Sequence, residues 1–265
     1  MFRQAFNKFT KLSAGLASVQ VAAVALTDKE LSKKPEWYQH AVRSLETAVK
    51  DLSKKGFIES KSVLTEAEDV FQRVLDVNNV EILWRYARLL TEKAELSHCA
   101  HEKKELLHEA KKIIKKALEI EPAAGISGLH KWAGIIFAKL GDLEKKCNDE
   151  CVKKHLKRAT EIDAKDQYAL YLYGAHLYKL KEYKEAVEVL KKAESVKPGF
   201  SPANKYYLGA ALKELGKKDE ALKVLKEAVA LTPKYAFEGK AKSEAKKILI
   251  TKYKLSAEDV EVKDD

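Results

Sequence analysis

The chain has 265 residues, of which 46% are apolar and 34% are charged. This apolar content excludes a fully disordered chain, and with only five Pro and eleven Gly the composition favours long helices with solvated faces. The net charge of +10 favours acidic partners, such as nucleic acid, anionic membrane or acidic protein tails, without choosing among them. Three cysteines, an odd number, favour reduced thiols over a disulfide framework.

The first 27 residues form a basic segment that differs from the rest of the chain. No acidic residue precedes Asp28, and Phe2, Phe6 and Phe9 recur at helical spacing. The run from Gly15 to Leu26 is nearly uncharged but too short to span a bilayer. This pattern is typical of a mitochondrial presequence or an interfacial anchor, so residues Met1–Leu26 could make peripheral membrane contact. A first helix that docks on the repeats, or a disordered segment, is the alternative.

Two helices are predicted before the repeats. Residues 1–34 end in a linker, and Pro35 suits the first turn of a helix. Apolar residues from Trp37 to Leu52 then fall on one helical face. A second helix is predicted from Ser62 to Val77, where two asparagines break the pattern.

Two later segments, Tyr168–Pro198 and Ala203–Pro233, match at a constant offset. The matched pairs, each 35 residues apart, are Gly174 with Gly209, Leu177 with Leu212, Ala186 with Ala221, Leu190 with Leu225, Ala193 with Ala228 and Pro198 with Pro233. We expect the Gly and Ala positions to lie where two helices approach closely, and each Pro to end the second helix. This spacing resembles the tetratricopeptide repeat (TPR), with Leu where that repeat often has an aromatic residue. The predicted fold is therefore all-α: antiparallel helix pairs stacked into a superhelix.

Two looser copies precede these repeats. The first has helices around Leu83–Leu90 and Ala110–Pro122, and the second around Gly134–Gly141 and Val152–Ala159, each with extra residues between its helices. A helix from Lys240 to Tyr253 is predicted to cap the stack, because a repeat array needs a polar closing face. The repeat domain is thus predicted over residues 35–254, followed by an acidic, disordered tail at residues 255–265.

Several segments between Val80 and Leu249 resemble the regulator of microtubule dynamics protein family. They are Val80-Glu81-Ile82-Leu83-Trp84-Arg85-Tyr86-Ala87-Arg88, His130-Lys131-Trp132, Lys153-Lys154-His155-Leu156 with Ala159, and Ala193-Glu194-Ser195-Val196-Lys197-Pro198-Gly199-Phe200. The resemblance implies a non-catalytic protein that associates with microtubules and spindles, and some relatives are placed at mitochondria. Many members carry an extra stretch inside the third repeat, but here Leu180-Lys181-Glu182-Tyr183 closes that turn directly.

No chemistry-bearing motif is apparent. Cys147, Cys151 and His155 share one helix face, but a fourth ligand and the usual zinc spacing are lacking, so we predict packing rather than a metal site. The cluster of His98, Cys99 and His101 is interpreted in the same way. Neither a Gly-rich phosphate loop nor a nucleophile motif is found, so we predict no enzyme activity and no cofactor.

In a TPR stack the first helix of each pair lines the concave groove. Mapping the repeat positions predicts a groove in which basic and aromatic side chains alternate: Trp84, Arg88, Lys131, Ile135, Lys139, Tyr168, Tyr171, Tyr178, Lys179, Tyr206 and Lys213. Tyr gives contact area at low entropy cost, and Arg and Lys favour acidic ligands. The alternative is that the Tyr residues pack between helices.

The favoured function is an adaptor that binds the acidic tails of tubulin, in the cytoplasm on microtubules or the spindle. Binding to other proteins is compatible with the same groove. The alternative is a mitochondrial or membrane-contact-site protein whose groove binds a lipid or a partner peptide. Nucleic acid is less favoured, because the charge permits it but no base-reading pattern is visible.

Overall fold

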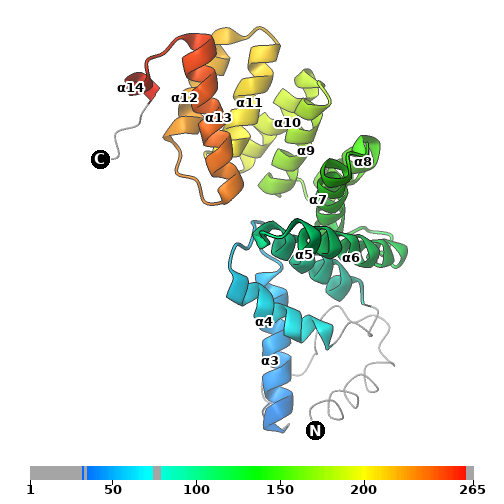
Figure 1. Cartoon of the computed structure of the whole chain (residues 1–265). Coiled ribbons are helices and arrows are strands. Elements are labelled where there is room, and N and C mark those ends of the chain that lie inside the picture. Colours follow the sequence, from blue (N-terminus) through cyan, green and yellow to red (C-terminus); the bar gives the residue numbers. More distant parts are fainter. Residues whose placement is uncertain (1–31, 33–34, 74–78, 261–265) are drawn as a thin grey trace. The chain divides into compact units, whose positions relative to one another are not determined.

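The structure, a computed structural model, describes Ser32, residues 35–73 and residues 79–260. Within these ranges it is helical and contains no strand (Figure 1). The predicted basic segment at residues 1–34 lies outside the described residues except for Ser32, and so do residues 74–78 and 261–265. The all-α prediction is confirmed for the described part of the chain.

The described chain divides into two compact units, with the boundary between Asn148 and Asp149. Unit 1 contains α3 (Glu36–Asp51), α4 (Lys61–Gln72), α5 (Val80–Leu96), α6 (Ala100–Glu119) and α7 (Ser127–Glu144). Unit 2 contains α8 (Asp149–Ile162), α9 (Gln167–Lys179), α10 (Tyr183–Val196), α11 (Pro202–Glu214), α12 (Lys218–Ala230), α13 (Ala236–Tyr253) and α14 (Ala257–Val260). The predicted repeat domain therefore comprises two units, and the boundary falls between the two helices of the second predicted pair.

Local sequence signals explain where the helices of unit 2 begin. The Asp166 carboxylate accepts hydrogen bonds from the backbone N–H groups of Tyr168 and Ala169, at 3.0 and 3.1 Å, and so caps α9. Ser201 caps α11 at the equivalent repeat position, and Pro202 occupies the first turn of that helix. The two caps thus repeat with the same 35-residue spacing as the apolar positions.

The helix pairs of unit 2 pack as the repeat predicts. A β-carbon placed on Gly174 would lie 2.5 Å from Cγ of Leu190, and one on Gly209 would lie 2.7 Å from Cγ of Leu225. The helices of each pair therefore approach too closely for any side chain at these positions. Ala186 and Ala221 are fully buried, as predicted for tight contacts between α9 and α10 and between α11 and α12.

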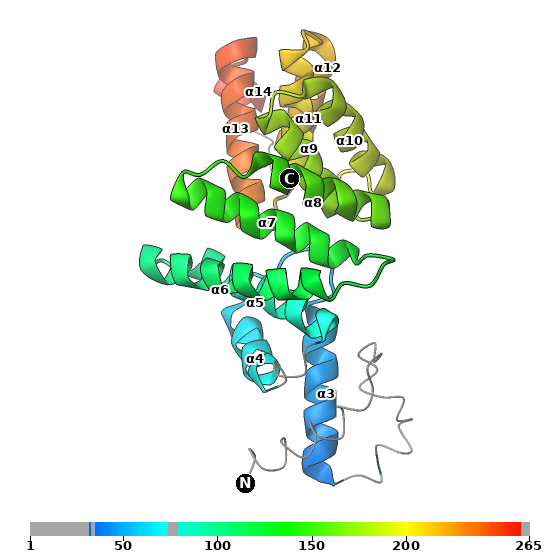
Figure 2. The same ribbon diagram turned by 90° about the vertical axis from the view of Figure 1, so that its right-hand side faces the viewer.

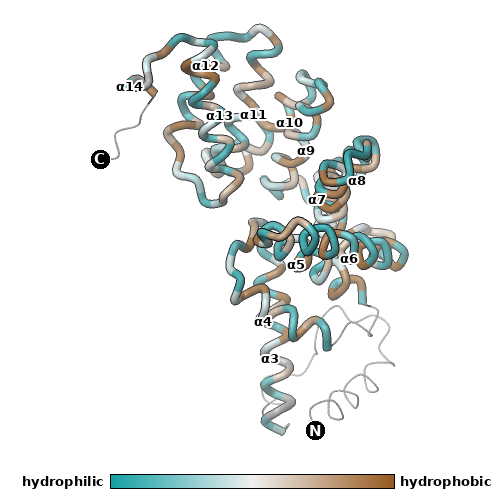
Figure 3. The backbone as a smooth tube through the Cα atoms, in the orientation of Figure 1, coloured by the Kyte–Doolittle hydropathy of each residue, from teal (hydrophilic) through white to brown (hydrophobic). Residues whose placement is uncertain are grey.

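The first helices of the repeats lie next to one another within unit 2. Helix α11 contacts both α9 and α13, while α10 and α12 pack against their partners in the pairs (Figures 1 and 2). Figure 3 shows hydrophobic and hydrophilic residues alternating along these helices, as expected for amphipathic helices in a stack. This arrangement makes α9, α11 and α13 the helices that could present one shared binding surface.

The C-terminal prediction needs a correction. Residues 257–260 form α14, and Val260 is 4% exposed in a cluster with Leu225, Val229 and Leu249. Leu255 also packs on this cluster. The prediction of a disordered tail from residue 255 is therefore wrong for residues 255–260, because two apolar side chains in this short acidic stretch cover the end of the last repeat.

In unit 1, the helices α5, α6 and α7 of the looser copies are longer than α9, α10, α11 and α12 of the two well-matched repeats. The residues interpreted as insertions largely extend α5 to Leu96, start α6 at Ala100 and carry α7 to Glu144. Helix α5 contacts α4, α6 and α7, so it is central to this unit. The predicted helix before the repeats is confirmed as α3, and the next as α4, whose predicted end lies outside the described residues.

Candidate partner-binding surface

A connected row of aromatic rings runs across α9, α11 and α13 of unit 2. The Tyr207 ring on α11 lies 5.6 Å from Tyr178 and 6.1 Å from Tyr171, both on α9, and 4.9 Å from its neighbour Tyr206, measured between ring centroids. Tyr171 is also stacked on Phe237 of α13, with centroids 5.9 Å apart. Side chains from three helices therefore form one aromatic layer.

The layer has a buried part and a half-exposed part. Tyr168 and Tyr171 are only 5% and 6% exposed, and Tyr168 is wedged between Phe200 and Tyr235. These two tyrosines therefore pack between helices, which was the alternative to their lining the groove. Tyr178 and Tyr206 remain half-buried, so parts of their rings are accessible to a partner.

Burial raises the pKa of three phenols in this layer. It raises the pKa of Tyr206 to about 12, and it raises the pKa of Tyr178, where nearby Glu214 acts in the same direction. Burial also raises the pKa of Tyr171 well above the usual range. At neutral pH these side chains therefore offer ring surface and hydroxyl hydrogen bonds rather than charge.

Two lysines lie on the same helices as the half-exposed rings, Lys179 on α9 and Lys213 on α11. Lys179, at the end of α9, is 54% exposed and lies 4.0 Å from a carboxylate oxygen of Asp149. Lys213 on α11 is 27% exposed, and its ammonium lies 2.5 Å from Glu214. The hydrogen bond to Glu214 is the main reason why the pKa of Lys213 is raised, so this lysine is charged at neutral pH. We define the tyrosine surface as Tyr178, Lys179, Tyr206, Tyr207 and Lys213.

Sequence reasoning missed two residues of the aromatic layer. Tyr207 occupies the repeat position of Leu172, and Phe237 lies one turn before the predicted start of its helix at Lys240. Only the run of two tyrosines at 206 and 207 could have pointed to Tyr207. Tyr178 and Lys213, by contrast, share one repeat position, and the structure brings them together on neighbouring helices.

The predicted groove residues of unit 1 have internal roles. Trp84 is 5% exposed, and its ring covers Gly128 of α7, where an added β-carbon would lie 2.8 Å from it. Arg88 and Lys131 are 1% and 4% exposed and hydrogen-bond to backbone carbonyls of residues 52–56. Their burial in this conformation contradicts the prediction that they line an open groove, since no partner can reach their charges.

The other two positions in unit 1 differ from each other. Ile135 is buried, whereas Lys139 is 31% exposed and pairs with Glu95 of α5 at 2.8 Å. The structure thus leaves one of the predicted lysines of this unit near the surface, and it already serves an interhelical ion pair.

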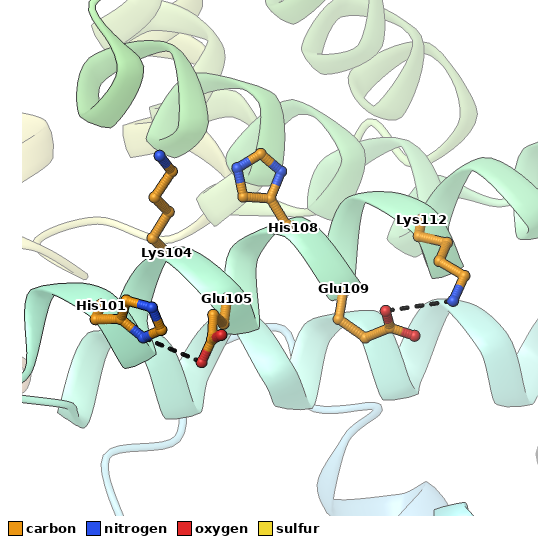
Figure 4. A pocket seen from close by; sticks show the side chains of 6 residues that line it. All are labelled: His101, Lys104, Glu105, His108, Glu109 and Lys112. Carbon is orange, nitrogen blue, oxygen red and sulfur yellow. Dashed lines mark ion pairs between the residues drawn. The ribbon is translucent and has the colours of Figure 1, made fainter.

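A shallow hollow lies along α6. Figure 4 shows its lining, which comes from this helix alone: His101, Lys104, Glu105, His108, Glu109 and Lys112. Charges of both signs alternate there and pair locally, as in the 3.3 Å contact of His101 with Glu105. Such a face is typical of a solvated helix surface rather than of a ligand site.

Two further properties of residues 32, 35–73 and 79–260 bear on chemistry and membranes. These residues contain no group of three His, Cys, Asp or Glu side chains placed to hold a metal ion. None of their helices combines the length and the apolar character needed to cross a membrane.

Comparison with known proteins identifies the family. A family model described as regulator of microtubule dynamics protein 1-3 matches residues 45–183 and 181–254, which is most of the chain. This chain belongs to that family. The match spans both units, so the family resemblance seen in the sequence is confirmed.

Relatives within the family are moderately similar. Regulator of microtubule dynamics protein 1 of Mus musculus is 31% identical over 167 residues, covering 52% of this chain and 54% of that protein. Regulator of microtubule dynamics protein 2 of Homo sapiens is 25% identical over 181 residues, covering 59% of this chain and 42% of that protein. The chain spans about half the length of the curated relatives it matches. These names describe regulators rather than enzymes.

Solved structures support the fold. The TPR protein YrrB, described as having an unusual peptide-binding site, aligns with a TM-score of 0.51 and 20% identity, covering 84% of this chain and all of YrrB. A structure of MamA aligns with a TM-score of 0.51 and 13% identity, covering 72% of this chain. At these identities the likeness shows the TPR-like fold alone.

Proposed function

We propose that this protein is a non-catalytic adaptor that binds microtubules, with the tyrosine surface of unit 2 as the contact for the acidic tails of tubulin. The observation that carries the proposal is the combination, on two adjacent helices, of half-exposed tyrosines with two charged lysines. Rigid aromatic rings supply contact area, and the lysines attract acidic segments.

The chain's charge and family support this choice of partner. The net charge of +10 favours an acidic polymer, and the relatives carry names that refer to microtubule dynamics. The proposed location follows from the proposed partner: the cytoplasm, on microtubules or the spindle.

A matched pair of variants tests the surface. Lys179→Glu with Lys213→Glu changes the tyrosine surface, whereas Lys223→Glu with Lys226→Glu changes two lysines on α12 of the same unit. Both double variants lower the net charge by the same amount. We expect the first pair to weaken microtubule binding about tenfold in co-sedimentation and the second to weaken it far less, because exposed charge contacts contribute about 0.2–1 kcal/mol each.

Two other results would change the proposal. Equal weakening by both pairs would mean that binding is diffuse and needs no dedicated surface. If the unmodified protein did not sediment with microtubules at low salt, the microtubule assignment would be lost.

The second candidate is a protein of mitochondria or membrane contact sites that binds a lipid or a partner peptide. It is favoured by the basic, acid-free sequence of Met1–Leu26. Fusing residues 1–27 to a neutral reporter tests it, since an anchoring segment moves the reporter to membranes and a docking segment leaves it diffuse.

A further inference from the structure

The hydroxyl of Ser53, in the turn that follows α3, lies against the guanidinium of Arg85 on α5. Nε and Nη2 of Arg85 both donate to Oγ of Ser53, at 3.0 and 2.8 Å. These two N–H groups form an edge of the guanidinium that can bind a carboxylate or a phosphate through two parallel hydrogen bonds. Here both groups converge on one neutral oxygen, so an edge suited to an oxyanion is occupied by a hydroxyl.

Contacts on its other sides hold the Arg85 guanidinium in place. Nη1 donates to the backbone carbonyl of Glu81 at 2.9 Å and also pairs with the carboxylate of that residue. The same carboxylate accepts from the indole of Trp84 at 2.9 Å, and the guanidinium carbon lies 4.2 Å from the centroid of the Trp84 ring. The Arg85 side chain is only 12% exposed. The edge that faces Ser53 is therefore already ordered, which lowers the entropy cost of binding an anion there.

The serine itself is exposed, unlike the arginine that it contacts. Lys50, Lys54 and Lys55 around it are exposed as well, and Lys54 pairs with Asp51 at 2.7 Å. Ser53 thus lies in a basic, non-helical part of the surface, and charge patterns of this kind are one means by which kinases select their substrates. An exposed serine beside an arginine that is already positioned for a phosphate has the chemistry of a phosphorylation switch.

We propose that Ser53 is a phosphorylation site, and that the Nε and Nη2 edge of Arg85 is the receptor for its phosphate. A kinase transfers the γ-phosphoryl group of a nucleoside triphosphate to Oγ of Ser53. The new O–P bond replaces the bond to the β-phosphate, the nucleoside diphosphate leaves, and the hydroxyl proton is released. This inference concerns unit 1 alone and does not depend on microtubule binding.

The modification changes both the contacts and the charge of the turn. Oγ of Ser53 loses the hydrogen bond that its hydroxyl donates to the Val49 carbonyl at 2.6 Å, and the phosphate oxygens accept from Arg85 instead. The new pair is charge-assisted and ties the end of α3 to α5. The phosphate also adds up to about two negative charges beside three exposed lysines, so this part of unit 1 becomes less basic.

Two full-length chains, each with phosphoserine built in at one position, 53 or 195, test the proposal. Ser195 is the matched control, because it is also exposed but its hydroxyl donates to the Lys192 carbonyl. Phosphorus NMR during a pH titration follows the second ionisation of each phosphate. Because a guanidinium favours the dianion, we expect the phosphate at position 53 to be half-ionised at a pH about one unit lower than the phosphate at position 195. Equal titration of the two phosphates would overturn the proposal.

A substitution tests whether Arg85 causes the difference. Arg85→Gln in the chain with phosphoserine 53 should remove most of it, whereas a difference that persists unchanged would come from the nearby lysines and would overturn the role of Arg85. If this variant does not fold, the Nε–H resonance of Arg85 in the unsubstituted chain decides. It should shift when position 53 carries the phosphate and stay in place when position 195 does. An equal response to both, or a response to neither, would contradict the proposal.

Mass spectrometry tests whether the site is used. The sample is the full chain isolated from its own cells while phosphatases are inhibited. We expect a phosphate on Ser53, since its hydroxyl is exposed and basic residues surround it. An unmodified Ser53 would overturn the assignment of a phosphorylation site, even if Arg85 binds a phosphate that is built in.

Discussion

At the scale of single residues, the two helices of each well-matched repeat approach each other closely at a glycine. The Leu190 side chain fills the space beside Gly174, and the Leu225 side chain does the same beside Gly209. Because the partner atoms belong to a fully buried leucine in both cases, they have little room to move. The 35-residue spacing in the sequence thus reflects two equivalent packing contacts.

Replacing these glycines should destabilise unit 2. We expect Gly174→Ala or Gly209→Ala to lower the free energy of unfolding by roughly 1–3 kcal/mol through overpacking. Gly239→Ala on α13 is the control: a β-carbon added there would meet no neighbouring atom within 4 Å, so alanine should raise stability by about 0.5–1 kcal/mol. Chemical denaturation measures all three. Equal effects at the three positions would contradict the packing.

A second residue-scale prediction concerns acid sensitivity in unit 1. Glu95 of α5 pairs with Lys139 of α7 at 2.8 Å and with Lys103 of α6 at 3.2 Å. Burial alone would raise the pKa of this carboxyl, but the two lysines outweigh it, so the pKa is lowered. A carboxyl whose pKa is lowered in the folded state stabilises the fold above its unfolded pKa, and this contribution is lost as pH falls through the folded pKa.

The variant Glu95→Gln should therefore be less stable than the unmodified protein at pH 7. The difference should disappear well below about pH 4, where both proteins lack the charge. Because the Glu95 side chain is 45% exposed, molar salt should also reduce the difference. Denaturation midpoints at about pH 7 and about pH 3 measure the effect. A difference that persists unchanged in acid would mean that the ion pairs are not its cause.

At the scale of elements, the turns inside the two well-matched repeats have the same backbone geometry. Lys181 has φ of 64° and Gly216 has φ of 76°, again 35 residues apart. In each turn the next N–H bonds back to a helix carbonyl: Glu182 to Leu177 at 2.9 Å and Lys217 to Leu212 at 3.0 Å. This is the usual left-handed end of a helix, for which glycine is preferred.

Replacing Lys181 by glycine should therefore stabilise the protein. The left-handed conformation costs a side-chain-bearing residue about 1–2 kcal/mol, and part of this gain is offset by the greater freedom of glycine in the unfolded chain. We expect Lys181→Gly to gain up to about 1 kcal/mol and Gly216→Lys to lose a similar amount, measured by thermal or urea unfolding. A loss of stability in Lys181→Gly together with a gain in Gly216→Lys would contradict the turn geometry.

The elements also show what sequence reasoning can recover. Helix pairs with strong periodicity, such as α9–α10 and α11–α12, were predictable because their packing contacts are local and repeated. The burial of Arg88 was not, because its partners at residues 52–56 are more than 30 positions away and act through their backbone. A backbone ligand leaves no pattern of side chains in a sequence. Much of the predicted groove in unit 1 therefore proved to be internal.

At the scale of the whole molecule, the chain combines a helical repeat fold with a large positive charge. The 50 basic and 40 acidic residues pair extensively on helix surfaces, as with Lys205, which contacts Glu194 at 3.1 Å and Glu227 at 2.7 Å. A lysine held between two carboxylates, as Lys205 is, contributes little to partner binding. We expect an acidic partner to be bound by the surplus of basic residues, together with the half-exposed tyrosines of unit 2.

The most direct test of this account is co-sedimentation with microtubules whose acidic tails are either intact or removed by protease. We predict binding to intact microtubules at low salt, steep weakening towards physiological salt because exposed charges are screened within about 8 Å, and a large loss when the tails are removed. Unchanged binding to trimmed microtubules, or binding that does not respond to salt, would contradict the claim that acidic tails are the ligand.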